Sequence, residues 1–342
     1  MTKYALLIGI DYIGKTRPLK GCINDIIMMR KYLIKKRKYS ANNIIVLRDD
    51  DSSFLLPDKN NIINKFTELI NIANTNKASE IFFHYSGHGE RSVDNNGDGD
   101  EISTYDNFII PVNYIQGDIN SYIRDDILRG IISNLNNTTK LLSVMDCCNS
   151  ATNLDLPYLY NYNKSGKKLL LLQDNSQQYA NLLGKNIYSL SGSKDDQLSV
   201  SAPNIYRAMS NPKNPKFSIN KSDRYGGVFT STLLKILNKK NTRNFSNILN
   251  ELNRKIKNPY TQESLLSSSK KIFTTRNIRN IRHVNIKILI KRFTPSKRFM
   301  PIKRNIQIKQ NKRNIKFNQN IQIKRFIAIK RILSIKRNIK FK

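Results

Sequence analysis

The sequence is poor in the residues that build disulfide frameworks and membrane spans. Its 342 residues include only three cysteines, Cys22, Cys147 and Cys148. An odd number with two adjacent members provides neither a disulfide framework nor the paired Cys-x-x-Cys spacing of structural zinc sites. No apolar run approaches the roughly 18 residues of a membrane-spanning helix, and the apolar segment Tyr4–Gly9 is too short for a signal peptide. We therefore expect an intracellular, cytoplasmic protein in a reducing compartment.

Acidic residues are missing from the last part of the chain. Glu263 is the last of the 25 acidic residues, and 24 Lys and Arg between Ser264 and Lys342 contribute most of the net charge of +34. This part is rich in Ile, Asn, Lys and Arg, repeats itself and lacks a helical or strand period. Such a composition does not build a packed core. We therefore predict a folded domain over 1–272 and a disordered basic tail over 273–342.

The tail has interpretations that the sequence leaves open. Charge of this density binds nucleic acid or an anionic membrane surface nonspecifically, through counterion release. The same composition also arises by drift toward Asn, Ile and Lys in an AT-rich genome. An exposed basic tail is equally a substrate for a protease directed at Lys or Arg.

Apolar runs of strand length recur before the tail, and most are followed by turn residues or by a helical pattern. This alternation predicts an α/β fold with a mostly parallel central sheet flanked by helices. The five predicted strands are Tyr4–Ile10, Ile44–Leu47, Ile81–Tyr85, Leu141–Met145 and Ile187–Leu190. Amphipathic spacing predicts helices over Asn24–Lys36, Asp58–Asn71 and Arg124–Leu135.

Two of these strands are followed by residues of catalytic type. After the third strand, His88 lies between Gly87 and Gly89, which permit a tight turn and a close backbone approach. After the fourth strand, Cys148 lies at a turn of its own. Because parallel strands have their carboxyl ends at one edge of a sheet, we expect imidazole and thiol to lie together. His88 can then deprotonate Cys148 to the nucleophilic thiolate.

The two turns resemble those of metacaspases, caspase-like cysteine peptidases with a YSGHG histidine turn and a D-[SC]-C-H-S-G cysteine turn. The resemblance extends in the same order over about 270 residues and includes Ala5–Tyr12, Leu19–Asp25, Leu154–Tyr158, Ser191–Gln197, Gly227–Thr230, Thr261–Gln262 and Ser267–Ser269. It implies a caspase-like three-layer fold, with a large-subunit part over about 1–160, a basic loop over 161–185 and a small-subunit part over 186–272. It also implies a monomer similar to type I metacaspases, without their Pro-rich prodomain.

The resemblance implies roles for individual residues. Cys148 is the nucleophile and His88 the general base, while the backbone N–H groups of Gly89 and Cys148 form the oxyanion hole. Cys147 lies where the family has Ser or Cys and is expected to be a packing residue, as is His84 within its strand. His283 lies in the tail.

The cysteine turn departs from the family at two positions. Asn149 replaces the usual His, and Ala151 replaces Gly. Ala151 would strain the loop if its position required a positive φ.

Preference for Arg or Lys before the scissile bond is a further implication of the resemblance. The matching specificity pocket consists of Asp25, Ser86 and Asp146, and two converging carboxylates suit a guanidinium or ammonium group. Each acid also has an alternative role. Asp25 lies in the first turn of a predicted helix, where acids favour the dipole, and Asp146 would serve as a cap of the cysteine turn.

Calcium activation is implied through four acids, Asp106, Asp125, Asp126 and Asp155, whereas the chemistry itself requires no cofactor. Carboxylate oxygens suit Ca²⁺ rather than Zn²⁺. Alternatively, Asp125 and Asp126 favour a helix start, and the neighbouring Arg124 would weaken cation binding.

A second acidic segment, Asp94–Glu101, begins with the first six positions of an EF-hand loop. The twelfth position is Tyr105 rather than Glu, so the EF-hand interpretation fails. A solvated acidic loop and a weak calcium contact both remain open.

Self-cleavage after Lys164, Lys167 or Lys168 is the last expectation, because family members are cut after basic residues downstream of the nucleophile. The sequence thus predicts a cysteine endopeptidase that acts on proteins or peptides with a basic residue before the scissile bond. The alternative is an inactive caspase-fold scaffold whose tail binds nucleic acid or an anionic membrane.

Overall fold

The computed structural model describes residues 2–93, 105–163, 165, 167–193, 201–202, 225–239, 244–260 and 262–272. Several predictions concern residues outside these ranges, namely the segment Asp94–Glu101, Lys164, His283 and the tail 273–342.

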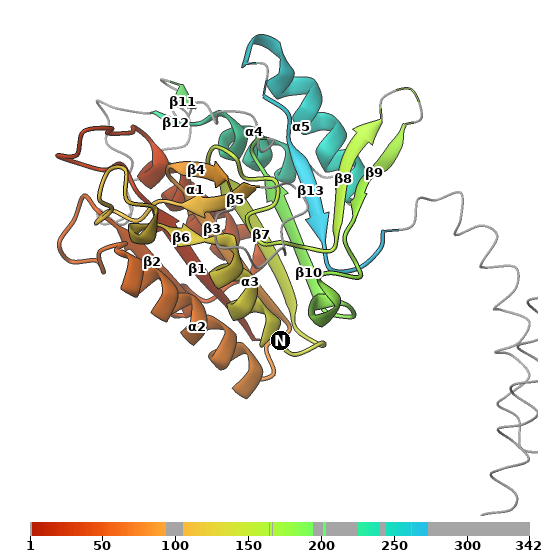
Figure 1. Cartoon of the computed structure of the whole chain (residues 1–342), viewed down its shortest axis with the longest axis horizontal. Coiled ribbons are helices and arrows are strands. Elements are labelled where there is room, and N and C mark those ends of the chain that lie inside the picture. Colours follow the sequence, from red (N-terminus) through yellow and green to blue (C-terminus); the bar gives the residue numbers. More distant parts are fainter. Residues whose placement is uncertain are drawn as a thin grey trace, which may run out of the picture. The chain divides into compact units, whose positions relative to one another are not determined.

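The described residues form a sheet of eight strands in the order β2-β1-β3-β7-β10-β13-β8-β9 (Figure 1). The first five strands of this order pair in parallel: β2 (Ile44–Arg48), β1 (Lys3–Gly9), β3 (Glu80–Ser86), β7 (Lys140–Asp146) and β10 (Asn186–Ser191). Each agrees with a predicted strand to within one residue at either end. The prediction of a mostly parallel central sheet is therefore confirmed.

Helices cover both faces of this sheet (Figure 1). Helices α2 (Lys59–Thr75) and α3 (Asp125–Ser133) pack on one face, and α1 (Cys22–Arg37), α4 (Val228–Leu237) and α5 (Phe245–Tyr260) pack on the other. Alternation along the strands produces the two faces, since successive side chains point to opposite sides. In β1, Leu6 and Ile8 pack in the hydrophobic core under α2 and α3, whereas Ala5 and Leu7 pack in the core under α1, α4 and α5. The three predicted helices thus belong to a three-layer α/β fold.

The remaining strands of the main sheet pair antiparallel with their neighbours. They are β13 (Leu265–Ser268), β8 (Tyr158–Asn163) and β9 (Lys168–Asp174). The expectation of a basic loop over 161–185 is corrected, because this range contains the end of β8, all of β9 and a short 3-10 helix at Ala180–Leu182. Tyr160 and Leu169 of the hairpin are buried in the same core as α1, α4 and α5, so one face of the two strands is packed.

Short antiparallel strands form two smaller sheets. The first contains β4 (Gly89–Val93), β5 (Tyr105–Ile109) and β6 (Ile123–Arg124), and the second contains β11 (Ser201–Ala202) and β12 (Gly226–Gly227). Further 3-10 turns lie at Ala41–Asn43 and Ile119–Ser121. Strand β4 begins directly after His88, and β6 leads directly into α3. The first small sheet therefore connects the histidine turn to the predicted calcium ligands.

Among the described residues, no helix combines the length and the apolar character of a membrane span.

Candidate active site

The register between β3 and β7 brings the histidine and cysteine turns together. Ser86, the last residue of β3, is paired with Asp146, the last residue of β7. His88 and Cys148 therefore follow the paired positions by the same number of residues. A methyl group on Gly89 would lie 2.1 Å from the Cys148 carbonyl oxygen. Only glycine permits this approach, which explains the glycine after the histidine.

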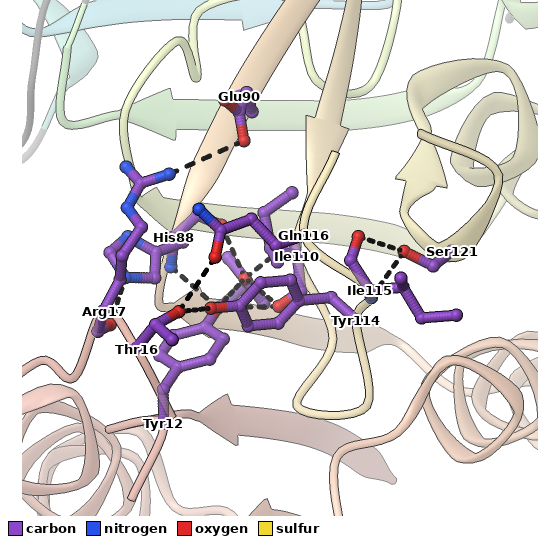
Figure 2. A network of polar contacts seen from close by, with 11 residues as sticks. Tyr12, Thr16, Arg17, His88, Glu90, Ile110, Tyr114, Ile115, Gln116 and Ser121 are labelled. Atoms are coloured by element: carbon purple, nitrogen blue, oxygen red, sulfur yellow. Dashed lines mark hydrogen bonds and ion pairs between the residues drawn. The ribbon is translucent and has the colours of Figure 1, made fainter. Parts of the chain in front are cut away.

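The His88 ring is fixed from two sides (Figure 2). Its Nε2 lies 2.7 Å from the carbonyl oxygen of Arg17, and the ring packs against Tyr12 with centroids 4.6 Å apart. Because a carbonyl oxygen only accepts hydrogen bonds, we assign the proton to Nε2, which leaves Nδ1 as the basic nitrogen. Burial lowers the pKa of His88 below its ordinary value of 6.5. The imidazole is therefore neutral at pH 7.

Two buried tyrosines hold the backbone of His88. The Tyr12 hydroxyl accepts a 2.9 Å hydrogen bond from the His88 N–H and donates one of 2.6 Å to the Ile110 carbonyl (Figure 2). The Tyr85 hydroxyl donates to the His88 carbonyl at 2.7 Å. Tyr12 has a φ of 53°, which is unusual for a bulky residue and is typical of functional constraint. No sequence motif predicts these roles of Tyr12, Tyr85 and the Arg17 carbonyl.

The adjacent cysteines differ in environment. Cys147 is fully buried, and its Sγ accepts a 3.3 Å hydrogen bond from the Asn153 side chain, whereas Cys148 is partly exposed. The Ser193 hydroxyl, just beyond β10, donates to the Cys147 carbonyl at 2.9 Å. Cys147 is thus a packing residue of the core, and its neighbour is the thiol accessible from solvent.

The family departures in the cysteine turn cause no strain at Ala151. Asn149 has a φ of 49°, and Asp155 at the end of the loop has a φ of 44°, whereas Ala151 lies outside the positive-φ region. Asn adopts the left-handed conformation more easily than most residues. The expected strain at Ala151 is therefore absent, because the left-handed residue next to the nucleophile is Asn149.

Asp25, Ser86 and Asp146, which we name the Asp25 cluster, lie together and buried around the backbone of Gly227. The Ser86 hydroxyl donates to Asp25 at 2.8 Å, and the Gly227 N–H donates to the two Asp25 oxygens at 2.9 and 3.1 Å. The Thr230 N–H, in the first turn of α4, donates to Asp146 at 3.0 Å. Asp146 therefore faces the positive end of α4 rather than only capping the cysteine turn.

Three of the four acids implied as calcium ligands lie together, and we name all four the Asp106 cluster. Asp106, Asp125 and Asp126 each offer one carboxylate oxygen within 4.8 Å of the others. Asp155 joins them through Arg129, whose guanidinium reaches both Asp126 and Asp155. Carboxylate oxygens are ligands of the kind that Ca²⁺ prefers. The guanidinium groups of Arg124 and Arg129 already contact these carboxylates.

Two of the three self-cleavage candidates lie within the described residues. Lys167 has a φ of 48° in the turn between β8 and β9, and Lys168 begins β9. Both are exposed to solvent. The turn is therefore accessible to a protease.

Comparison with known proteins decides the family. The family described as "Metacaspase, peptidase C14 domain" matches residues 3–157. Metacaspase-1 of Scheffersomyces stipitis is 32% identical over 292 residues, a match that covers 78% of this chain and 70% of the relative. The chain belongs to the metacaspase family. This family comprises cysteine-type endopeptidases of the C14 class.

Other relatives agree with the assignment. Metacaspase-1B of Aspergillus terreus is 39% identical over 158 residues, which cover 46% of this chain and 40% of that protein. The structure is also similar to the crystal structure of the Drosophila initiator caspase Dronc, with a TM-score of 0.39, 8% identity and 78% coverage of each chain. Because that TM-score is below 0.5, the metacaspase assignment rests on the sequence relatives.

Proposed function

We propose that this metacaspase hydrolyses peptide bonds after Arg or Lys, with Cys148 as nucleophile and His88 as general base. The observation that carries the proposal is the pairing of Ser86 with Asp146, which brings both turns to one edge of the sheet with Gly89 against Cys148. The hydrogen bond from Nε2 to the Arg17 carbonyl supports it, because this bond reserves Nδ1 for proton transfer.

The reaction follows from these groups. His88 Nδ1 takes the proton of the Cys148 thiol, and the thiolate attacks the scissile carbonyl carbon. The N–H groups of Gly89 and Cys148 stabilise the oxyanion of the tetrahedral intermediate. The protonated His88 then donates its proton to the leaving amine, and water hydrolyses the remaining thioester.

The Asp25 cluster supports the basic preference. Asp25 and Asp146 provide two carboxylates close to the nucleophile, and Ser86 orients Asp25 through its hydroxyl. A guanidinium or ammonium group that enters between them gains charge-assisted hydrogen bonds in a desolvated setting. An acidic side chain at the same position is repelled.

Calcium and self-cleavage are the two remaining parts of the proposal. The residues that would hold Ca²⁺ are those of the Asp106 cluster, and the ion would supply positive charge to their carboxylates. Because Arg124 and Arg129 already supply positive charge there, we expect turnover both with calcium and with chelator. The exposed turn at Lys167 and Lys168, together with Lys164, is the proposed site of self-cleavage.

The test is a peptidase assay of the full chain on peptides with Arg, Lys or Asp before the scissile bond, with calcium and with chelator. We expect turnover of the Arg and Lys peptides, and a loss of at least about 1,000-fold in Cys148→Ala. Cys147→Ala is the matched control and should retain activity. Cleavage after Asp would overturn only the specificity. Failure of the wild type under every condition would favour the inactive scaffold, whose tail binds nucleic acid or membrane.

A further inference from the structure

Two arginines lie among the carboxylates of the Asp106 cluster. Arg124 Nη1 is 3.4 Å from Asp106 Oδ2 and 4.0 Å from Asp126 Oδ2. Arg129 Nη2 donates to Asp126 Oδ1 at 2.5 Å, and its Nε is 3.8 Å from Asp155 Oδ2. Each guanidinium therefore contacts two of the four acids.

Aromatic rings hold both guanidinium groups in place. Arg124 lies over the ring of Phe108, 5.7 Å from its centroid, and Arg129 lies over the ring of Tyr179 at 5.0 Å. Both rings are buried. Stacking on an aromatic face fixes a planar guanidinium and lowers the entropy that its ion pairs cost. The two positive charges are thus presented to the acids by the surrounding core.

The same cluster restrains the loop that follows the nucleophile. Asp155 lies at the end of this loop, and Thr152 within it accepts a 2.6 Å hydrogen bond from the Asn107 side chain. The Asn107 backbone N–H donates to Asp125 at 3.0 Å. The loop is therefore tied to β5 and α3, and the ion pair of Arg129 with Asp155 is one of the ties.

We propose that Arg124 and Arg129 are built-in counter-cations that take the place of calcium in the Asp106 cluster. They compensate the charge of the acids and hold the nucleophile loop without a metal. They also lower the affinity for Ca²⁺, because a divalent ion has to enter beside two fixed positive charges. Only the activity readout of this proposal rests on the proposed function, since metal binding is measured without turnover.

The experiment measures calcium binding in the full chain carrying Cys148→Ala, which also prevents self-digestion. Calorimetric titration with CaCl₂ and the thermal midpoint with calcium or chelator are compared for the background protein, Arg124→Gln, Arg129→Gln and the double variant. Removal of one nearby charge should raise the calcium affinity at least about tenfold. The thermal midpoint of the double variant should rise with calcium, and that of the background protein should stay constant.

Control variants distinguish the effect of the arginine charge on calcium affinity from an effect on folding. Arg91→Gln removes a positive charge from β4 of the same small sheet, where Arg91 lies over the Tyr105 ring, and should leave calcium binding unchanged. Arg129→Lys keeps the charge and should bind calcium as weakly as the background protein. If the double variant does not fold, the comparison of Arg129→Gln with Arg129→Lys still tests the proposal. With Cys148 restored, the wild type should be equally active in calcium and in chelator, and Arg129→Gln should require calcium.

The proposal is overturned if the background protein binds calcium as tightly as the arginine variants. It is also overturned if Arg129→Gln and Arg129→Lys gain affinity equally. A wild type without any peptidase activity would contradict the proposed function and leave the binding comparison intact.

Discussion

The Asp25 and Asp106 clusters contain the same kind of side chain, and the described residues contact them with different groups. Asp25 and Asp146 accept hydrogen bonds from the Ser86 hydroxyl and from the N–H groups of Gly227 and Thr230. In the Asp106 cluster, the guanidinium groups of two arginines contact Asp106, Asp126 and Asp155, and the Asn107 N–H donates to Asp125.

This difference shows how one residue type serves two purposes. Neutral donors orient a carboxylate, whereas a guanidinium compensates its charge. The proposed division is recognition of a basic substrate by the Asp25 cluster and support of the nucleophile loop by the Asp106 cluster.

Neutralising an acid in each cluster tests this division most strongly. We expect Asp25→Asn and Asp146→Asn each to lower kcat/KM for an Arg peptide about 100-fold, the scale of one charge-assisted hydrogen bond. Asp126→Asn is the matched change in the other cluster and should cost less than about threefold. Equal losses in the two clusters would contradict the assignment.

A methyl group at Gly227 would disturb the Asp25 cluster by volume alone. Its Cβ would lie 2.1 Å from Asp146 Oδ2 and 2.8 Å from Asp25 Oδ2, while the φ of −61° suits alanine. Overpacking of this kind costs about 2 kcal/mol. Urea unfolding of Gly227→Ala should show this loss, and kcat/KM for Arg peptides should fall with it. An unchanged unfolding midpoint would disprove the close contact.

The buried side chain of His84 makes the stability of the fold depend on pH. Burial lowers the pKa of His84 to about 3, and its Nε2 is 3.3 Å from the hydroxyl of Thr230, whose N–H donates to Asp146. The unfolded chain binds the proton near pH 6.5 and the folded chain only near pH 3, so stability is complete above pH 6.5 and falls as the pH drops.

The expected slope from His84 is about 1.4 kcal/mol per pH unit below pH 6.5. Urea unfolding between pH 6.5 and 5 should show a smaller slope for His84→Gln than for the wild type. A slope that does not change would show that His84 is not held neutral by burial.

Gly130 gives the smallest expected effect. It lies in α3 between Arg129 and Ile131, and a methyl group there would meet no described atom within 4 Å apart from its chain neighbours and the backbone of its own helix. Replacement by alanine in an open helix position should stabilise the protein by about 0.5–1 kcal/mol, with unchanged kcat/KM. A loss of stability in Gly130→Ala would show that α3 does not tolerate changes beside the Asp106 cluster.

The sequence predicted the parallel half of the fold more completely than the antiparallel half. Buried parallel strands are continuous apolar runs, which are easily recognised. Strand β9 begins with lysine at the edge of the sheet, and Leu169 is its one buried residue, so its range resembled a basic loop. The three strands of the first small sheet were missed because their runs are short and mixed in polarity.

The sequence also predicted only part of the candidate active site. The turns at His88 and Cys148 were predicted because each has a local sequence motif. The groups that orient His88 have none, because a carbonyl oxygen such as that of Arg17 is independent of residue type. Tyr12 reaches the His88 backbone across 76 positions of the chain, a contact that no local pattern predicts.

The strand order has a consequence for the chain once the turn between β8 and β9 is cut. Strands β7 and β8 would belong to the first fragment, and β9, β10 and β13 to the second. Because β10 and β13 lie between β7 and β8 in the sheet, the fragments are interleaved rather than side by side. A nicked molecule would therefore migrate as one species under native conditions and separate into two only when denatured.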